Sequence, residues 1–262
     1  MIFQLNEVEH NYGENVHILD NPVLSCLLLE LSLSSTVQPR ISWLLENIYN
    51  GLINTVVNRE FPVRHESVLT RMSTIQGKKA LVSGELLNRD VQLVIVNMAT
   101  AGDQPANIIY NWLNYIFNPS LIRQDHLMPN RTVGNHGEIT GCDIAGCKIG
   151  GEVEGAIMLL PDPMGATGGT VEETIDIYKG RGEPEKIIAM HLVITPEYIR
   201  KVKERFPTLV VYAVRLDRGL SSPEVLKTLP GTDIQNEVGL NANGYIVPGL
   251  GGMGELINNR EK

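Results

Sequence analysis

The stretch IMLLPDPMGATGGTVEETI, residues 157–175, decides the fold class. It opens with an uncharged apolar run that is typical of a strand buried on both faces. It then passes through a loop rich in glycine and threonine into a segment with helical spacing. The residues that share one face of this predicted helix are Val171, Thr174, Ile175 and Tyr178. A buried strand that leads through a tight loop into a helix predicts a βα unit of an α/β protein.

Further strands and helices alternate along the chain. Short apolar runs predict buried strands at 91–98, 187–194 and 209–214. Thr195 followed by Pro196 is typical of a helix start, with an N-cap residue and a proline in the first helical position. This alternation favours a parallel sheet with right-handed crossovers and with ligands at the carboxyl ends of its strands.

The first third of the chain reads as helical. Apolar residues recur there at helical spacing, which predicts an amphipathic helix whose stripe belongs to the core. The stripe consists of Ile41, Leu44, Leu45, Ile48, Leu52 and Val56. A glycine-rich stretch at 134–155 reads as a surface loop or a β-hairpin. Residues 221–243 read as an excursion from the sheet, with a short helix near 224–228.

The loop inside 157–175 has the residue types of an anion-binding site. Glycines let consecutive backbone N–H groups turn toward one anion, and the positive end of the following helix adds to the field. Thr167 and Thr170 add hydroxyl donors, and the Asp162 carboxylate can accept hydrogen bonds from sugar hydroxyls. The loop lacks the lysine of a Walker loop and the spacing of dinucleotide folds. It predicts a ribose 5-phosphate site, with a ligand-free turn as the less favoured alternative.

Composition restricts the class of protein. With 262 residues, 43% hydrophobic and 20% charged, the chain fits one globular domain or two small ones. A net charge of −8, from 22 Lys and Arg against 30 Asp and Glu, disfavours nucleic acid as a partner. We expect no membrane association and a cytoplasmic protein, because neither a spanning apolar stretch nor a basic leader is found. Cys26, Cys142 and Cys147 are too few for a disulfide framework and lack zinc-site spacing, so no metal is assigned to side chains.

Two motifs resemble those of the uracil phosphoribosyltransferases, which have the type I phosphoribosyltransferase fold. The first is Asp-Pro-Met-Gly-Ala-Thr-Gly-Gly-Thr at 162–170, and the second is Gly-Tyr-Ile-Val-Pro-Gly-Leu-Gly at 244–251. Lys148 precedes Asp162 by 14 residues, as a lysine of that family does. The resemblance implies an α/β protein with a parallel-sheet, Rossmann-like core flanked by helices. It also implies a β-hairpin or flexible loop and a small C-terminal hood that binds the base.

The resemblance also divides the chain, which we predict to be a single phosphoribosyltransferase-like domain over 1–262. Residues 1–85 would form its N-terminal helical part and 86–220 its α/β core with the phosphate loop. Residues 221–262 would form an insertion and the base-binding segment. The family further implies a homodimer or a homotetramer.

The implied reaction transfers a 5-phosphoribosyl group from phosphoribosyl diphosphate (PRPP) to uracil, giving UMP and diphosphate. Mg²⁺ would be bound through the diphosphate of PRPP. Asp162 is implied to be catalytic. The residues implied to bind the phosphoribosyl group are Asp162, Pro163, Met164, Gly165, Ala166, Thr167, Gly168, Gly169 and Thr170. Those implied to bind the base, partly through backbone groups, are Tyr245, Ile246, Gly251, Gly252 and Met253.

The sequence departs from the family where the diphosphate would bind. The family's Pro-Ile-Leu-Arg-Ala-Gly turn reads Asn-Met-Ala-Thr-Ala-Gly at 97–102, so Thr100 replaces an arginine. A second family arginine falls at Asn135, with Arg131 nearby as a candidate replacement. Asp217 matches a family aspartate, and its role is open between ion pairing and a ligand contact.

These departures leave three functions open. The first is the transferase just described. The second is a nucleotide-binding regulator or pseudoenzyme that binds UMP or a related monophosphate and does not handle diphosphate. The third is a phosphoribosyltransferase for another base, which Met253 and the insertion at 221–243 would permit by changing the base pocket or a lid over it.

Other polar residues carry less information. His191 lies in an apolar run and is more typical of a hydrogen-bonded core histidine than of a catalyst. Asp143 and Lys148 lie in the glycine-rich stretch, where they could close over a ligand as the family's flexible loop does or belong to a solvated loop.

Overall fold

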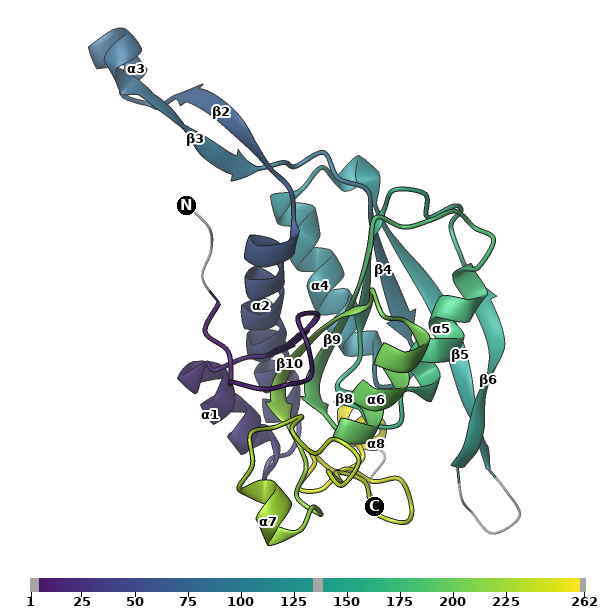
Figure 1. Cartoon of the computed structure of the whole chain (residues 1–262). Helices are drawn as coiled ribbons and strands as arrows, with labels where there is room; N and C mark the ends of the chain where they lie inside the picture. Colours follow the sequence, from purple (N-terminus) through teal and green to yellow (C-terminus); the bar gives the residue numbers. More distant parts are fainter. Residues whose placement is uncertain (1–4, 134–138, 260–262) are drawn as a thin grey trace.

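The computed structural model describes residues 5–133 and 139–259 of the chain. Its centre is a sheet with the strand order β1-β10-β9-β7-β4-β5-β6, in which every neighbouring pair is parallel except β5 and β6 (Figure 1). A short strand, β8, pairs with β9 beside this path. The strands are β1 (Val16–Ile18), β4 (Leu93–Met98), β5 (Ile122–Val133), β6 (Ile139–Lys148), β7 (Ile157–Pro161), β8 (Met164–Gly165), β9 (Lys186–Ile194) and β10 (Val210–Leu216). The predicted, mostly parallel sheet is confirmed.

Helices cover both faces of this sheet (Figure 1). They are α1 (Pro22–Leu31), α2 (Arg40–Glu60) and α4 (Asp103–Ile116) on one face, and α5 (Gly169–Tyr178) and α6 (Pro196–Arg205) on the other. Along β4, Leu93 and Ile95 belong to the first core, whereas Val94 and Val96 belong to the second. Burial on both faces explains why this strand is apolar throughout. No helix in the described part of the chain has both the length and the hydropathy needed to cross a membrane.

Local sequence signals also predicted particular elements correctly. All six residues of the apolar stripe in the first third are buried in α2. Thr195 is the N-cap of α6, where its Oγ1 accepts a hydrogen bond from the Tyr198 amide at 3.0 Å, and Pro196 takes the first position. The stretch at 134–155 contains β6, which pairs with β5 as an antiparallel hairpin, one of the two forms predicted for it.

The prediction that residues 1–85 are helical is wrong in two places. β1 is the edge strand of the main sheet, paired with β10. After α2, the chain forms an antiparallel ribbon of β2 (Val63–Leu69) and β3 (Leu81–Leu87), with α3 (Ser73–Gln76) and η1 (Gly77–Ala80) at its tip. The helical stripe ends within α2, and the residues beyond it pair across the ribbon instead. This ribbon, residues 63–87, is called the β2–β3 arm, and it projects away from the main sheet (Figure 1).

The strand order reverses between β4 and β7. From β4 the chain passes through α4 to β5 on one side, whereas β7, β9 and β10 lie on the other side of β4. In open parallel sheets, ligands bind outside the carboxyl ends of the strands at such a reversal. The loops that follow β4 and β7 are therefore the expected location of a ligand.

Candidate functional site

The loop after β7 rests on β9 and on the start of α6. The Pro163 carbonyl accepts hydrogen bonds from two amides of β9, each at 3.1 Å. The Gly165 carbonyl accepts one from the Thr195 amide at 3.1 Å, and the Ala166 carbonyl accepts one from the Thr195 hydroxyl at 2.7 Å. Because these carbonyl groups are bound on the protein side, the loop can direct N–H groups toward an anion on its other side.

The local structure requires glycine at two positions of this loop, Gly165 and Gly168, but not at Gly169. Gly168 has a φ of +80°, in the left-handed region, and a Cβ on Gly165 would lie 2.8 Å from Ile194 Cγ2. A Cβ on Gly169 would meet nothing closer than Thr167 Oγ1 at 3.7 Å. The N-cap residue Gly168 has no side chain to cap α5, and the Gly169 amide has only a long hydrogen bond of 3.5 Å to the Thr167 hydroxyl. The bare backbone at Gly169 therefore leaves the positive end of α5 open to close approach by an anion.

Asp162 is fixed by its backbone on both sides. Its amide donates to the Met190 carbonyl at 3.0 Å, and its carbonyl accepts a hydrogen bond from His191 Nδ1 at 2.7 Å. The residue is half-buried, and its Oδ1 accepts a hydrogen bond from the Met164 amide at 3.2 Å. A fixed carboxylate next to amide donors is suited to accept the hydroxyl groups of a sugar whose phosphate lies on those amides.

His191 supports the loop from inside the core. It is fully buried, and because Nδ1 donates to the Asp162 carbonyl, Nε2 accepts the Tyr198 hydroxyl at 2.7 Å. Burial lowers the pKa of His191 to about 4, so the ring is neutral at neutral pH. The prediction of a hydrogen-bonded core histidine is confirmed.

Acidification is expected to destabilise the protein through His191. Its pKa is 6.5 in the unfolded chain and about 4 in the folded one, so between these values the unfolded state binds the extra proton. The contribution is complete above pH 6.5 and is lost as the pH falls toward 4, amounting to about 2 kcal/mol at about pH 5. Denaturant unfolding at about pH 7.5 and at about pH 5 measures this difference in the free energy of unfolding. A His191→Gln variant should lose less stability on acidification by that amount, and an equal loss in both proteins would contradict the assignment.

The turn after β4 lies beside the loop. A Cβ on Gly102 would lie 3.1 Å from the Pro161 carbonyl oxygen, so this turn packs on the end of β7. Thr100 belongs to the same turn, and its hydroxyl would lie 3.1 Å from a Cβ on Gly254 of α8 (Met253–Ile257). The structure therefore brings Thr100, the loop and the C-terminal segment together at one edge of the sheet.

Two further residues predicted to contact diphosphate are Arg131 and Asn135. Arg131 lies on β5 with its backbone paired to that of Cys142 on β6, and its side chain is outside what the structure describes. Asn135 falls within 134–138, outside the described residues. Among Thr100, Arg131 and Asn135, the structure describes the surroundings of the side chain only for Thr100.

The predicted base-binding segment starts as a small antiparallel loop. Leu240 bridges to Ile246, whose side chain is buried in the core, so a base could be read there through the backbone. Tyr245 beside it is exposed. The other base-binding residues predicted are Gly251, in the left-handed region at φ +76°, Gly252, the N-cap of α8, and Met253, buried at the start of that helix. Gly251, Gly252 and Met253 thus lead directly to Gly254, the residue that approaches Thr100.

An ion pair holds this segment from β10. Arg215 Nε and Nη2 donate to the two Asp217 carboxylate oxygens at 2.5 and 2.9 Å. The Gly249 amide donates to Asp217 Oδ2 at 2.8 Å, and its carbonyl accepts a hydrogen bond from Arg215 Nη2 at 3.1 Å. Asp217 is buried, so the geometry favours the ion-pairing alternative over a ligand contact. Sequence reasoning missed Arg215, although its place two residues before Asp217 on a strand puts both on one face.

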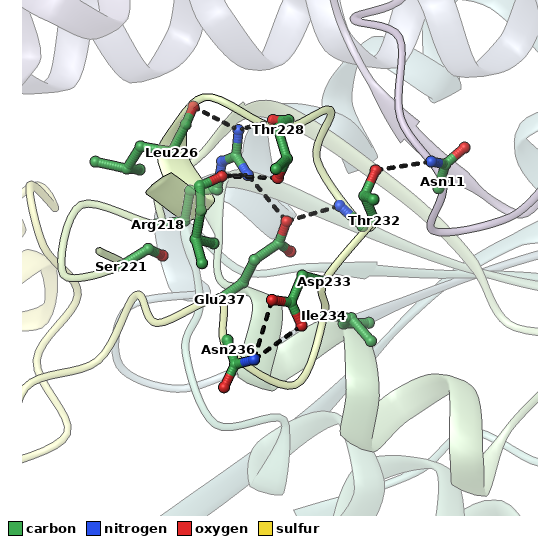
Figure 2. A network of polar contacts seen from close by, with 12 residues as sticks. Asn11, Arg218, Ser221, Leu226, Thr228, Thr232, Asp233, Ile234, Asn236 and Glu237 are labelled. Carbon is green, nitrogen blue, oxygen red and sulfur yellow. Dashed lines mark hydrogen bonds and ion pairs between the residues drawn. The ribbon is translucent and has the colours of Figure 1, made fainter. Parts of the chain in front are cut away.

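The insertion is tied to the body of the protein, as Figure 2 shows. Arg218 Nη1 donates to the fully buried Glu237 at 2.9 Å, and Arg218 Nη2 donates to the Thr228 carbonyl at 2.8 Å. Glu237 also accepts the Gly231 amide at 2.8 Å and the hydroxyl of Tyr12. The short predicted helix is present as α7 (Pro223–Leu226). The buried ion pair between Arg218 and Glu237 holds the insertion at 221–243 against the body of the protein, so in this conformation it does not form an open lid.

A separate cavity of about 700 Å³ lies at the opposite edge of the sheet, where β7, β9 and β10 begin. Part of its polar lining is internally paired. Glu60 accepts Lys186 Nζ at 2.7 Å and the Tyr212 hydroxyl at 2.7 Å, and the Tyr212 ring stacks on His17. This pairing gives the lining a structural role, far from the loop that follows β7.

Part of the chain matches a known family. Residues 143–234 match the model of the uracil phosphoribosyltransferase family. The uracil phosphoribosyltransferase of Thermococcus sibiricus is 32% identical over 98 residues, which cover 37% of this chain and 34% of that protein. The chain thus spans about a third of the length of this curated relative.

Solved structures extend the likeness to the fold. The AQ2163 protein from Aquifex aeolicus superposes with a TM-score of 0.69 at 19% identity, covering 92% of this chain and 97% of that one. The adenine phosphoribosyltransferase of Trypanosoma brucei gives a TM-score of 0.49 at 9% identity, covering 84% and 90%. The matched residues 143–234 include the loop, β9 and α6, so the similarity to the uracil phosphoribosyltransferase family covers the candidate site and the elements that support it.

Proposed function

We propose that the chain is a phosphoribosyltransferase that transfers the 5-phosphoribosyl group of PRPP to uracil, giving UMP and diphosphate. The observation that carries the proposal is the position of the loop at 162–170. It lies where the strand order reverses, next to the turn that holds Thr100 and to the C-terminal segment. A phosphate on the loop leaves the ribose within reach of Asp162 and the base on the side of the C-terminal segment.

The 5-phosphate would bind at the start of α5. The N-cap residue of this helix, Gly168, provides no side-chain cap, and the positive end of the helix favours an anion. The hydroxyl groups of Thr167 and Thr170 supply further donors. This arrangement fixes the sugar before the reaction, which converts binding energy into orientation at the reacting carbon.

The reaction breaks the bond between C1 of the ribose and a diphosphate oxygen and forms a bond between C1 and a uracil nitrogen, which gives up its proton. Positive charge develops on the ribose ring, and the carboxylate of Asp162, whose backbone is held by the Met190 carbonyl and by His191, would stabilise it. Mg²⁺ would enter with PRPP, because this ion usually binds through substrate phosphates and water. Within the described ranges, no group of three or more His, Cys, Asp or Glu side chains is arranged to hold a metal.

Uracil would be read by backbone groups of the C-terminal segment. A planar base with fixed donors and acceptors is well matched by amides and carbonyls on a rigid turn. The rigidity comes from Asp217 and Arg215, which bind the amide and carbonyl groups of Gly249. The segment is therefore held in place before the base arrives, and little ordering is required on binding.

A second candidate function, nucleotide binding without transfer, is favoured by Thr100. The turn after β4 carries this neutral hydroxyl where the related enzymes are expected to hold diphosphate with an arginine. A hydrogen bond to a charged group is typically worth about 1.5–3 kcal/mol, so the loss of one such bond slows a diphosphate-dependent step roughly tenfold or more.

The purified protein with Mg²⁺, PRPP and uracil is expected to form UMP, measured by chromatography, with other pyrimidine and purine bases tested in parallel. Calorimetric titration with UMP is done on the same sample. Tight UMP binding without turnover would overturn the transferase proposal and favour a nucleotide-binding regulator. Turnover with another base and none with uracil would show that the acceptor is that base and not uracil. If the protein showed no turnover and bound no nucleotide, the loop would no longer be a candidate phosphate site.

A further inference from the structure

The start of α6 contacts both halves of the candidate site. Thr195, the N-cap residue, holds the loop at 162–170, since its amide donates to the Gly165 carbonyl at 3.1 Å and its hydroxyl donates to the Ala166 carbonyl at 2.7 Å. Glu197 lies two residues further along, in the first turn of the helix, and is half-buried. Its carboxylate accepts hydrogen bonds from residues 239 and 240, which lead into the predicted base-binding segment. Less than one helical turn therefore separates the contact with the loop from the contact with that segment.

Glu197 binds two consecutive backbone amides. Its Oε1 accepts a hydrogen bond from the Gly239 amide at 3.0 Å and one from the Leu240 amide at 3.2 Å, and its Oε2 accepts the Gly239 amide at 3.2 Å as well. Leu240 bridges to Ile246, one of the residues predicted to bind the base. Hydrogen bonds to an ionised acceptor are about twice as strong as those between neutral groups. Glu197 therefore determines where the backbone opposite Ile246 lies.

Gly239 fits tightly between the start of α6 and Asp217. A Cβ on Gly239 would clash with the Asp217 carbonyl oxygen and would lie 3.0 Å from Thr195 Cβ. The Gly239 carbonyl accepts a hydrogen bond from the Val247 amide, inside the base-binding segment, at 2.8 Å. The chain at Gly239 thus contacts Thr195, Glu197 and the segment at once. A shift of the first turn of α6 would therefore move the segment with it.

These contacts are more specific than the stability of α6 requires. A carboxylate in the first turn is favoured at the positive end of any helix, whatever else it binds. The carboxylate of Glu197 instead accepts amides of another part of the chain, 42 and 43 residues away. Its position therefore links two segments that are far apart in the sequence and lie on either side of the proposed ligand.

We propose that Glu197 is a positioning residue for the base-binding segment, through which a ligand on the loop at 162–170 tightens the binding of uracil. The inference rests on the proposed function, because it takes the loop as the phosphate site and the segment as the base site. A ligand on the loop restrains Gly165 and Ala166, and through Thr195 it restrains the first turn of α6. The base then binds to a segment that is already ordered, so less entropy is lost. By linkage, uracil must tighten the binding of the ligand on the loop by the same factor.

Calorimetric titration of the whole protein with uracil, without and with saturating ribose 5-phosphate, measures this coupling. In the wild type, ribose 5-phosphate should lower the Kd of uracil at least about fivefold. In a Glu197→Ala variant both amides lose their acceptor, and ribose 5-phosphate should change the Kd of uracil by less than about twofold. A Glu197→Gln variant keeps an oxygen in the place of Oε1, which accepts both amides, so it should retain most of the coupling.

The matched control is Glu204→Ala, which removes an exposed carboxylate from the same helix about two turns further along. It should couple the two ligands as the wild type does. Steady-state kinetics give a second measurement. Glu197→Ala should raise the KM for uracil at least about tenfold and change kcat by less than about threefold, because the groups at the reacting carbon are unchanged.

The coupling factor separates positioning from a general loss of structure. Circular dichroism checks that each variant is folded, and a merely destabilised variant would bind both ligands more weakly with the factor unchanged. A Glu197→Ala protein that kept the wild-type factor would overturn the inference. If the wild type bound uracil and ribose 5-phosphate without any mutual effect, the inference would fall while the proposed function stood. If the wild type bound neither, both would fall.

Discussion

Asparagine in place of Asp162 is expected to lower kcat/KM for PRPP about a hundredfold. The change keeps the shape of the side chain and an Oδ1 acceptor for the Met164 amide, and the backbone bonds to Met190 and His191 remain. What is lost is the negative charge, which strengthens hydrogen bonds from ribose hydroxyls by about 1.5–3 kcal/mol each and stabilises the positive ribose ring. Steady-state kinetics with varied PRPP measure the effect, and UMP titration should show weaker binding.

The control for this experiment is Asp176→Asn on α5. Asp176 lies at the surface, where its carboxylate pairs with Lys179 and with Arg205 at 2.9 Å. Surface ion pairs contribute little, so kcat/KM should stay within about twofold of the wild type. If Asp162→Asn instead kept wild-type kinetics, the carboxylate would not lie at the ribose and the assignment of this loop would be wrong.

Asparagine in place of Asp217 is expected to raise the KM for uracil at least about tenfold and to lower the free energy of unfolding by about 3 kcal/mol. The carboxylate is buried, and its oxygens accept hydrogen bonds from Arg215 and from the Gly249 amide. The NH2 group of asparagine would face either the guanidinium of Arg215 or the Gly249 amide, which are both donors. The guanidinium would also lose its counter-charge. The KM for PRPP should change less, because the phosphate loop has no bond to Gly249 among those that the structure describes.

The matched variant is Glu237→Gln. Glu237 is also a buried acid paired with an arginine, Arg218, but its bonds hold the insertion and not Gly249. A similar loss of stability is expected, measured by denaturant unfolding, with the KM for uracil close to that of the wild type. If both variants raised this KM equally, the effect of Asp217 would be general destabilisation, and the ion pair would not be what positions the base-binding segment.

Those parts of the fold with a local signal could be predicted from the sequence. The apolar runs of β4, β7 and β9 identify strands because burial on both faces excludes polar residues. The start of α6 follows from Thr195 and Pro196, whose side chains act within one helical turn. The loop at 162–170 could be proposed as an anion site from the sequence, because such a site needs small residues in consecutive positions.

What depends on contacts between distant residues could not be predicted. That Asp217 also holds the C-terminal segment depends on its bond to the Gly249 amide, and Gly249 lies 32 residues away in the chain. The insertion gives no sign in its composition that Glu237 meets Arg218 and Tyr12 inside the protein. The β2–β3 arm was misassigned with the helical part before it, because a ribbon exposed on both faces lacks the alternation of polar and apolar residues that identifies strands.

The support beneath the loop determines how much of this chain could be transplanted into another protein. Carbonyl groups of the loop bind β9 and Thr195, and Gly165 approaches Ile194 so closely that a Cβ would lie 2.8 Å from its Cγ2. Residues 162–170 grafted alone onto a foreign strand and helix would lose these contacts and their shape. The smallest transferable unit therefore runs from β7 through β8, α5 and β9 to the end of α6. That unit falls entirely within residues 143–234, so the predicted anion site and the structure that shapes it lie together in the part of the chain that matches the family model.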